Sequence, residues 1–300
     1  MIRVTAVVPS WNGRELLDMV LPDLLVQTEP VRVLVVDNGS ADGSVEHVRS
    51  RYPVVELLAL ERNVGFAAAV NAGMEAAETE FVALFNNDME LERDCVAELV
   101  AALDADPRVG SATAKMQMLR EPGVLDGAGD SLTWFGGAWR IGHGEPDDGR
   151  YDEARPVLSA CGGAALYRAS ALRDVGLFDP TFFAYLEDVD WGVRAQLAGW
   201  SCRYVPTAVI RHLGGATSKR VSDLETYLVH RNNVALVVRS LPLWTWPFAA
   251  AFQLWTFARS PRKAAIARGW RHAARRLPRT LRSRRDVARR ASITPLLRAR

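Results

Sequence analysis

The first part of the chain alternates short apolar, β-branched runs with stretches of helical periodicity. The runs occupy residues 4–8, 31–36, 54–58 and 81–85, and the helical stretches between them cover 13–27, 44–51 and 66–77. Short apolar runs joined by single helices are typical of βαβ units, whose parallel strands are buried on both faces. We therefore predict an α/β fold built around an open, mainly parallel sheet.

Polar, turn-forming segments follow three of these runs. The segment PSWN covers residues 9–12, DNGS covers 37–40 and NND covers 86–88. Ligands of open α/β sheets bind beyond the carboxyl ends of the strands. We expect the three segments to line one crevice.

Two of these segments carry oxygen atoms that suit a ligand. Asp37 would offer an acceptor to ribose hydroxyls or to an N–H group of a base, although the same residues also form ordinary turns and helix caps. Asn86, Asn87 and Asp88 offer hard oxygen ligands that suit Mg²⁺ or Mn²⁺ on a diphosphate. The alternative for them is again a turn at a strand end.

A further group of acids opens a predicted helix after the aromatic stretch 182–185: Glu187, Asp188 and Asp190. Acids in a first turn are favoured by the helix dipole, so a structural role is one interpretation. A carboxylate beside apolar rings has a raised proton affinity, which suits a general base.

The second half of the chain is less regular. Residues 119–151 lose periodicity and are rich in Gly, Asp and Trp, which predicts a long, functional loop or hairpin. Order returns at 157–160, followed by helices at 169–175 and 187–198, short strands at 203–205 and 208–211, and a helix at 223–239.

His212 follows these strands and precedes two glycines. A lone histidine is more often structural or exposed than a ligand, and the other four keep that interpretation: His47, His143, His230 and His272.

In order and spacing, seven segments resemble the inverting family 2 glycosyltransferases of the GT-A fold, and most of all their bacterial rhamnosyltransferase-type branch. They lie between about residues 4 and 240 and read VVPSWNG, VVDNGSADGS, RNVGFAAAVNAG, FNNDM, CGGAALYRASALRDVGLFD, FFAYLEDVDWGVRAQLAGW and RHLGGATS. The resemblance implies a GT-A nucleotide-binding catalytic domain over residues 1–240, with a helical extension at 241–300.

The resemblance also implies roles for single residues. Asp88 and His212 would hold a divalent metal, Mg²⁺ or Mn²⁺, at the diphosphate. Asp188 would be the catalytic base, and Glu187 would orient substrate. The nucleotide pocket would be lined by Pro9, Asn12, Asp37, Asn63, Gly65 and Asn87. The donor sugar and acceptor would be bordered by Gly162, Gly163, Ala164 and Trp191.

The implied activity is transfer of a sugar from a nucleotide-diphosphate donor to an acceptor hydroxyl, with inversion in a single displacement. Rhamnose from dTDP-rhamnose is the expected donor, and the acceptor would be a glycan or a lipid-linked sugar of the cell envelope. One departure is Asn86, which replaces the first carboxylate of the usual Asp-X-Asp motif and should weaken metal binding. This leaves a catalytically weak sugar-nucleotide-binding protein as an alternative. A glycoside hydrolase is another, although the adjacent Glu187 and Asp188 cannot flank one glycosidic bond in opposed geometry.

The C-terminal region has a different composition. Residues 259–300 hold 15 Lys or Arg and one acid, whereas residues 1–258 hold 22 basic and 34 acidic side chains. Residues 241–258 are uncharged and rich in Trp and Phe, with interruptions at Pro242 and Pro247. This pattern favours an interfacial helix on an anionic membrane over a packed core or oligomer helix, or a membrane span. Nucleic-acid binding is a weaker interpretation, because no recognition fold accompanies the arginines.

The cysteines and the N-terminus bear on the compartment. Cys95, Cys161 and Cys202 are an odd number without a CxxC pair, which favours neither disulfides nor a zinc site. The first residues lack the pattern of a secretory signal. We expect a cytoplasmic protein, with the C-terminal region as a candidate for peripheral attachment to the inner face of the cell membrane.

Overall fold

The computed structural model describes residues 2–214, 222–287, 289–293 and 297. Its strands are β1 (Val4–Ser10), β2 (Val31–Asp37), β3 (Glu56–Ala59), β4 (Phe81–Phe85), β5 (Met89–Leu91), β6 (Val109–Met118), β7 (Leu125–Gly127), β8 (Asp130–Leu132), β9 (Ala138–Arg140), β10 (Arg155–Val157), β11 (Ala164–Arg168) and β12 (Ser201–His212). Its helices are α1 (Arg14–Leu25), α2 (Ser44–Arg51), α3 (Phe66–Ala76), α4 (Cys95–Asp104), α5 (Ala169–Val175), α6 (Glu187–Ala198), α7 (Asp223–Ser240), α8 (Trp246–Arg259) and α9 (Lys263–Asp286), with 3₁₀ turns η1 (Pro180–Phe182) and η2 (Leu243–Thr245).

One large mixed sheet forms the centre of the molecule. Its strands run β10-β12-β6-β11-β4-β1-β2-β3, with β5 beside β12 and β7 beside β6. Strands β1 to β4 are parallel, β11 is antiparallel to both β4 and β6, and β12 is parallel to β6. The start of β11 therefore lies at the same edge as the ends of β1, β2, β4 and β12. This edge collects most of the predicted site.

Both faces of the sheet are covered by helices, which explains why β1 and β4 are buried along their whole length. Val4, Ala6 and Val8 of β1 pack with α1, α2 and α4, whereas Val7 packs on the other face with α3, α5 and α6. All four of these side chains are fully buried. Continuous burial on two faces is the pattern expected of parallel strands between helices.

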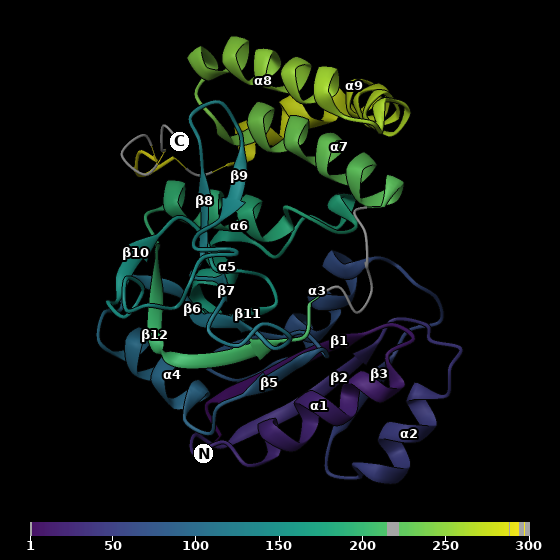
Figure 1. Cartoon of the computed structure of the whole chain (residues 1–300), viewed down its shortest axis with the longest axis vertical. Coiled ribbons are helices and arrows are strands. Elements are labelled where there is room, and N and C mark those ends of the chain that lie inside the picture. The colour runs from purple at the N-terminus through teal and green to yellow at the C-terminus, as the bar shows by residue number, and fades with distance from the viewer. Residues whose placement is uncertain (1, 215–221, 288, 294–296, 298–300) are drawn as a thin grey trace.

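The C-terminal helices form a further layer beyond α6, at the end of the molecule opposite α1 and α2 (Figure 1). A third apolar cluster joins α6 to α7 and α8 and to Leu132 of β8. Arg284 of α9 closes the carboxyl end of α7, because its Nη1 lies 2.9 Å from the carbonyl oxygen of Val238, 3.1 Å from that of Arg239 and 2.8 Å from that of Leu241. Within the described ranges, each helix is too short or too polar to cross a membrane.

The β8–β9 hairpin reaches from the sheet edge to α8. Trp134 at its tip stacks on Trp244, with ring centroids 6.2 Å apart, and meets Phe248 edge-on at 4.7 Å. Phe135 packs on Phe252 at 5.0 Å. The hairpin thus connects the aromatic C-terminal segment to the interior of the protein.

The structure corrects the sequence interpretation of β12. Residues 203–205 and 208–211 belong to this single strand, which continues past an irregularity between Val205 and Val209. The 119–151 segment contains a hairpin, as predicted, formed by β8 and β9, and a further short strand, β7, that pairs with β6. Residues 215–218 of the RHLGGATS segment lie outside the described residues. The division at residue 240 stays a prediction, and α7 contacts α6 before it and α9 after it.

Candidate active site

The loops after β1 and β2 are joined by hydrogen bonds at the carboxyl edge of the sheet. The backbone N–H of Asn12 donates to Ser40 Oγ at 2.9 Å, and its side-chain oxygen accepts from the N–H of Ala41 at 2.9 Å. Pro9 and Asn12, both predicted for the nucleotide pocket, thus lie next to the loop that starts at Asp37. These two hydrogen bonds join the loops after β1 and β2 at this part of the edge.

Asp37 has an unsatisfied oxygen in this assembly. Its Oδ1 accepts from the N–H of Ser40 at 3.0 Å, which is the predicted turn, but its Oδ2 is buried without a partner among the described residues. Buried polar atoms are normally hydrogen-bonded, so an orphan carboxylate oxygen at a sheet edge marks a place for a donor from a ligand.

The loop after β3 is tied to the loop after β2. Asn63 Oδ1 accepts from the N–H of Gly65 at 2.9 Å and from Asn38 Nδ2 at 3.2 Å. Gly65 has a φ of +91°, and a Cβ there would lie 2.5 Å from the ring of Phe183. The space that a glycine leaves at this position is filled by Phe183, from the segment before α6.

The loop after β4 contacts both neighbouring strands. Asn87 Nδ2 donates to Ser10 Oγ at 3.0 Å, and the N–H of Asn86 donates to the carbonyl of Gly163 at 3.0 Å. A Cβ on Gly163 would lie 2.5 Å from Asn86 Nδ2. Asn86 therefore packs against the start of β11.

Asp88 and His212 meet across this edge. Asp88 Oδ1 lies 3.2 Å from His212 Nε2, and the N–H of Leu213 donates to the carbonyl of Asp88 at 2.9 Å. On the other side of the ring, His212 Nδ1 lies 2.8 Å from Oδ2 of Asp126. An ionised carboxylate only accepts hydrogen bonds, so Asp126 fixes a proton on Nδ1 and leaves Nε2 facing Asp88.

The charges at this histidine favour its protonated form when no metal is bound. Burial disfavours the imidazolium, but hydrogen bonds to Asp126 and Asp88 outweigh it and raise the pKa of His212 to about 9. Burial also opposes ionisation of Asp126, yet the His212 hydrogen bond and the charge of Arg140 hold the pKa of that carboxyl below its ordinary value.

Asp88 and His212 together would offer a divalent ion a carboxylate oxygen and an imidazole nitrogen, both of which are ligands of such ions. Asp88 Oδ1 and His212 Nε2 lie 3.2 Å apart, which is the distance of an ion pair. Asp126 supplies the second carboxylate that commonly orients a histidine ligand.

Asp188 lies at the start of α6, and two backbone N–H groups hold its carboxylate. Its Oδ2 accepts from the N–H of Gly162 at 2.8 Å and its Oδ1 from the N–H of Val189 at 2.7 Å. Burial raises the pKa of Asp188 despite these hydrogen bonds and the charge of Arg140. Glu187 is 5% exposed, its Oε2 has no partner among the described residues, and burial together with the charge of Asp188 raises its pKa well above the ordinary value.

Asp130 and Arg140, which the sequence interpretation missed, lie near Asp188. Asp130 of β8, Cys161 and Asp188 offer potential ligand atoms within 4.8 Å of one another. Arg140 is paired opposite Asp130 in the hairpin, and its pKa is raised by Cys161 first and then by the neighbouring carboxylates, so it supplies positive charge to this cluster. Burial raises the pKa of Asp130, and the negative charge of Asp188 raises it further. We interpret the cluster as the electrostatic surroundings of Asp188.

Two residues predicted for the donor and acceptor pocket are buried. Trp191 is 1% exposed, packs edge-on against Tyr167 at 4.9 Å and donates its Nε1–H to the carbonyl of Gly176 at 2.8 Å. It lies three residues beyond Asp188 in α6 and packs in the apolar cluster that also holds Tyr167 and Phe178, so its place in the pocket stays a prediction. The methyl group of Ala164 is fully buried in β11. Gly162 and Gly163 remain beside Asp188 and Asn86.

Comparisons with known proteins point in the same direction. The family model described as "Glycosyl transferase family 2" matches residues 5–176. The chain is 31% identical over 224 residues to N-acetylglucosaminyl-diphospho-decaprenol L-rhamnosyltransferase of Mycobacterium tuberculosis, an alignment that covers 65% of this chain and 71% of that protein. It is also 31% identical over 210 residues to pre-mycofactocin glycosyltransferase of the same species, covering 70% of this chain and 42% of that protein.

Two solved structures share the architecture at low sequence identity. GalNAc-T7 with UDP, GalNAc and Mn²⁺ has a TM-score of 0.64 at 16% identity, over 80% of this chain and 48% of that one. The mannosyltransferase PcManGT from Pyrobaculum calidifontis, in complex with GDP-Man and Mn²⁺, has a TM-score of 0.57 at 22% identity, over 95% of this chain and 84% of that one. The architecture of the present chain is therefore the GT-A type.

Proposed function

The chain belongs to glycosyl transferase family 2, and from that premise we propose that it transfers a sugar from a nucleotide-diphosphate donor to an acceptor hydroxyl, with inversion at the anomeric carbon. The observation that carries the proposal is the connection between the Asp88 strand and the Asp188 helix. Asn86 donates to the Gly163 carbonyl and Gly162 donates to Asp188, so two adjacent glycines join the two predicted halves of the site.

The nucleotide binds across the ends of β1 to β4 in this proposal. Asp37 Oδ2, buried without a partner among the described residues, accepts from a ribose hydroxyl or a base N–H. The remaining pocket residues are Pro9, Asn12, Asn63, Gly65 and Asn87. We assign rhamnose from dTDP-rhamnose as the donor, and the 31% identity to a mycobacterial rhamnosyltransferase supports this assignment.

A divalent cation, Mg²⁺ or Mn²⁺, would be held by Asp88 and His212, with Asp126 orienting the histidine. When bound, such an ion neutralises negative charge that develops on the leaving diphosphate. GalNAc-T7 and PcManGT were both solved with Mn²⁺, which supports this part of the proposal. The single carboxylate of Asp88 makes us expect weaker metal affinity than in relatives with a second one.

Asp188 acts as the general base. Its backbone hydrogen bonds from Gly162 and Val189 fix the carboxylate, and its raised pKa makes it a better proton acceptor than a free aspartate. As the acceptor oxygen bonds to the anomeric carbon, the bond to the diphosphate breaks on the opposite face and the hydroxyl proton passes to Asp188. A positioned base contributes roughly 10² to 10⁴ in rate. Glu187, beside it, orients substrate.

We place the acceptor, a glycan or a lipid-linked sugar of the cell envelope, at the inner face of the cell membrane. Trp244, Phe248 and Trp255 are 52%, 48% and 52% exposed in the C-terminal helical layer. Arg271, Arg275, Arg279 and Arg282 are exposed along α9 with the spacing of one helix face. Exposed aromatic rings and a row of exposed arginines in one helical layer suit the headgroup region of an anionic bilayer.

A screen of nucleotide sugars for Mg²⁺- or Mn²⁺-dependent nucleoside diphosphate release in the presence of acceptor tests the function. Transfer requires both donor and acceptor, and chelation should abolish it. A glycoside hydrolase would instead act on the finished linkage without nucleotide. Tight donor binding without release, over a full acceptor panel, would favour a binding protein.

A further inference from the structure

The segment that leads into the predicted base follows an unfavourable backbone path. Phe183 has φ 66° and ψ −62°, and the N–H of Ala184 donates to the carbonyl of Phe182 at 2.8 Å. This is a γ-turn of the rare, strained hand. Tyr185 and Leu186 follow with φ values of 70° and 69°. Large L-residues seldom adopt positive φ, so this path needs support from surrounding structure.

That support comes from α7. Asn232 is 2% exposed, and its Nδ2 lies 3.0 Å from the carbonyl oxygen of Phe182, 2.9 Å from that of Ala184 and 2.8 Å from that of Tyr185. Its neighbour Arg231 donates from Nη2 to Phe182 at 2.6 Å. One helix therefore supplies donors to most of the carbonyl groups of the strained turn.

The turn lies between both halves of the proposed site. At one side, the carbonyl of Phe183 accepts from the N–H of Ala67 at 3.1 Å, at the start of α3 beside Gly65. At the other side, Leu186 is the residue before α6, and its carbonyl accepts from the N–H of Asp190 at 2.9 Å. The direction of Glu187 and Asp188 therefore depends on the path of residues 182–186.

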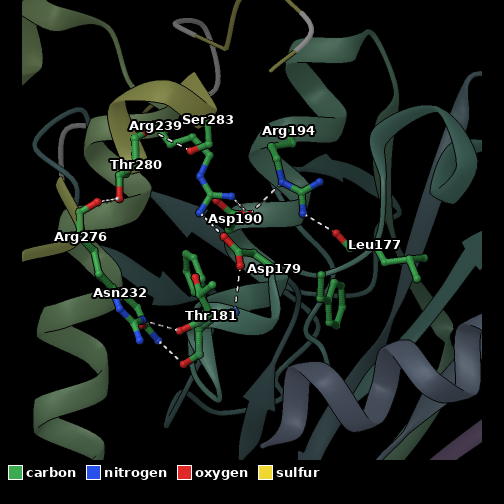
Figure 2. A network of polar contacts seen from close by, with 12 residues as sticks. Leu177, Asp179, Thr181, Asp190, Arg194, Asn232, Arg239, Arg276, Thr280 and Ser283 are labelled. Carbon is green, nitrogen blue, oxygen red and sulfur yellow. Dashed lines mark hydrogen bonds and ion pairs between the residues drawn. The ribbon is translucent and has the colours of Figure 1, made fainter. Parts of the chain in front are cut away.

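A second contact from the same helix holds the first turn of α6. Arg239 Nη2 lies 2.6 Å from Asp179 Oδ2, and its Nη1 lies 3.6 Å from Asp190 Oδ2. Arg194 pairs with the same carboxylate of Asp190 at 2.8 Å (Figure 2). Asp190 is fully buried, so these arginines fix the helix two residues beyond Asp188.

We propose that Asn232 is a positioning residue for the transfer reaction: it holds the γ-turn at Phe183 and thereby sets the orientation of Asp188. The inference rests on the proposed function of Asp188 as base. Helix α7 lies outside residues 5–176, which the family model matches. In this inference it influences the rate of transfer through the position of Asp188. The asparagine suits this role because a primary amide offers two hydrogens to neighbouring carbonyl groups.

The adjacent Asn233 provides a matched control. It is also buried on α7, at 5% exposed, and its Nδ2 donates to the carbonyl of Gly136 in the β8–β9 hairpin at 2.5 Å. We expect Asn232→Ala and Asn233→Ala to lower the melting temperature similarly. Asn232→Ala alone should lower kcat for transfer by about tenfold to a hundredfold.

Hydrogen exchange gives a readout that does not depend on activity. Exchange at residues 183–190 should be faster in Asn232→Ala than in both the parent protein and Asn233→Ala. Equal kcat and equal exchange in the two variants would overturn the inference. If the parent protein shows no transfer with any donor, the proposed function fails, whereas the exchange comparison still decides whether Asn232 holds the turn.

Discussion

Oδ2 of Asp126 lies 2.8 Å from Nδ1 of His212, although 86 positions separate the two residues in the chain. The contact exists because β7 pairs with β6 beside the end of β12. It makes the histidine part of a chain of three groups, with Asp88 on the far side of the ring.

Asp126→Asn should weaken Mn²⁺ binding by about 10- to 100-fold, because an amide accepts a weaker hydrogen bond and no longer fixes the ring. Titration of Mn²⁺ against the purified variant measures this directly. Asp148→Asn removes an exposed carboxylate of the same segment that pairs with Arg150, and it should bind Mn²⁺ like the parent. Equal affinity in both variants would contradict the role of Asp126.

The metal-free protein should gain stability from the charged form of His212. Its folded pKa of about 9 exceeds the ordinary value of 6.5. The contribution is therefore fully present below about pH 6.5 and is lost as the pH rises through about 9. With a chelator present, the melting temperature of the parent should exceed that of His212→Gln most at low pH. A gap that stays constant from pH 6 to 10 would contradict this assignment.

Asp188→Asn should lower kcat by roughly 10²- to 10⁴-fold and leave nucleotide affinity unchanged. The amide keeps the shape of the side chain but cannot take the proton. Steady-state transfer assays and nucleotide titration together separate the two effects. Near-parental kcat in this variant would remove Asp188 from the mechanism.

In the pH profile of kcat/KM, activity should fall on the acid side at a higher pH than it would with a base of ordinary carboxylate pKa. The reason is that burial raises the pKa of Asp188, and this fall in activity is called the acid limb below. Activity increases as the pH rises through that value, since the base must be ionised. Arg140→Gln takes a positive charge away from Asp188 and should shift the limb to higher pH. A limb that does not move would separate Arg140 from the titration.

The double variant Trp244→Ser with Trp255→Ser should bind anionic liposomes at least about tenfold more weakly than the parent. Cosedimentation over a lipid titration measures this. Val54→Ser removes a side chain that is 74% exposed on the body of the protein, and it serves as the control. Binding that resists the double substitution would place the membrane contact elsewhere.

The part of the site on β1 to β4 could be predicted because local sequence determines it. Asp37 ends the mainly apolar strand β2 and Asp88 lies just beyond β4, and a parallel sheet brings such strand ends to one edge. His212 ends β12, and pairing of β12 with β6 brings it to the same edge.

Asp126, Asp130 and Arg140 could not be found this way. They lie in short strands without periodicity, and only tertiary pairing places them beside His212 and Asp188. Their one signal was the length of an irregular segment in a compact domain. Trp191 was assigned to the pocket from the family resemblance, and the sequence around it does not indicate that its ring is buried against Tyr167.

The arginine that closes α7 also limits how this catalyst can be recombined with its relatives. Arg284 binds three carbonyl groups at the end of the helix that carries Asn232 and Arg239. A chimera that took only residues 1–240 from this protein would keep all the proposed catalytic side chains. The carbonyl groups at the end of α7 would then lose the hydrogen bonds from Arg284. A transplant must therefore carry α9 with it, or provide another cation at the same place.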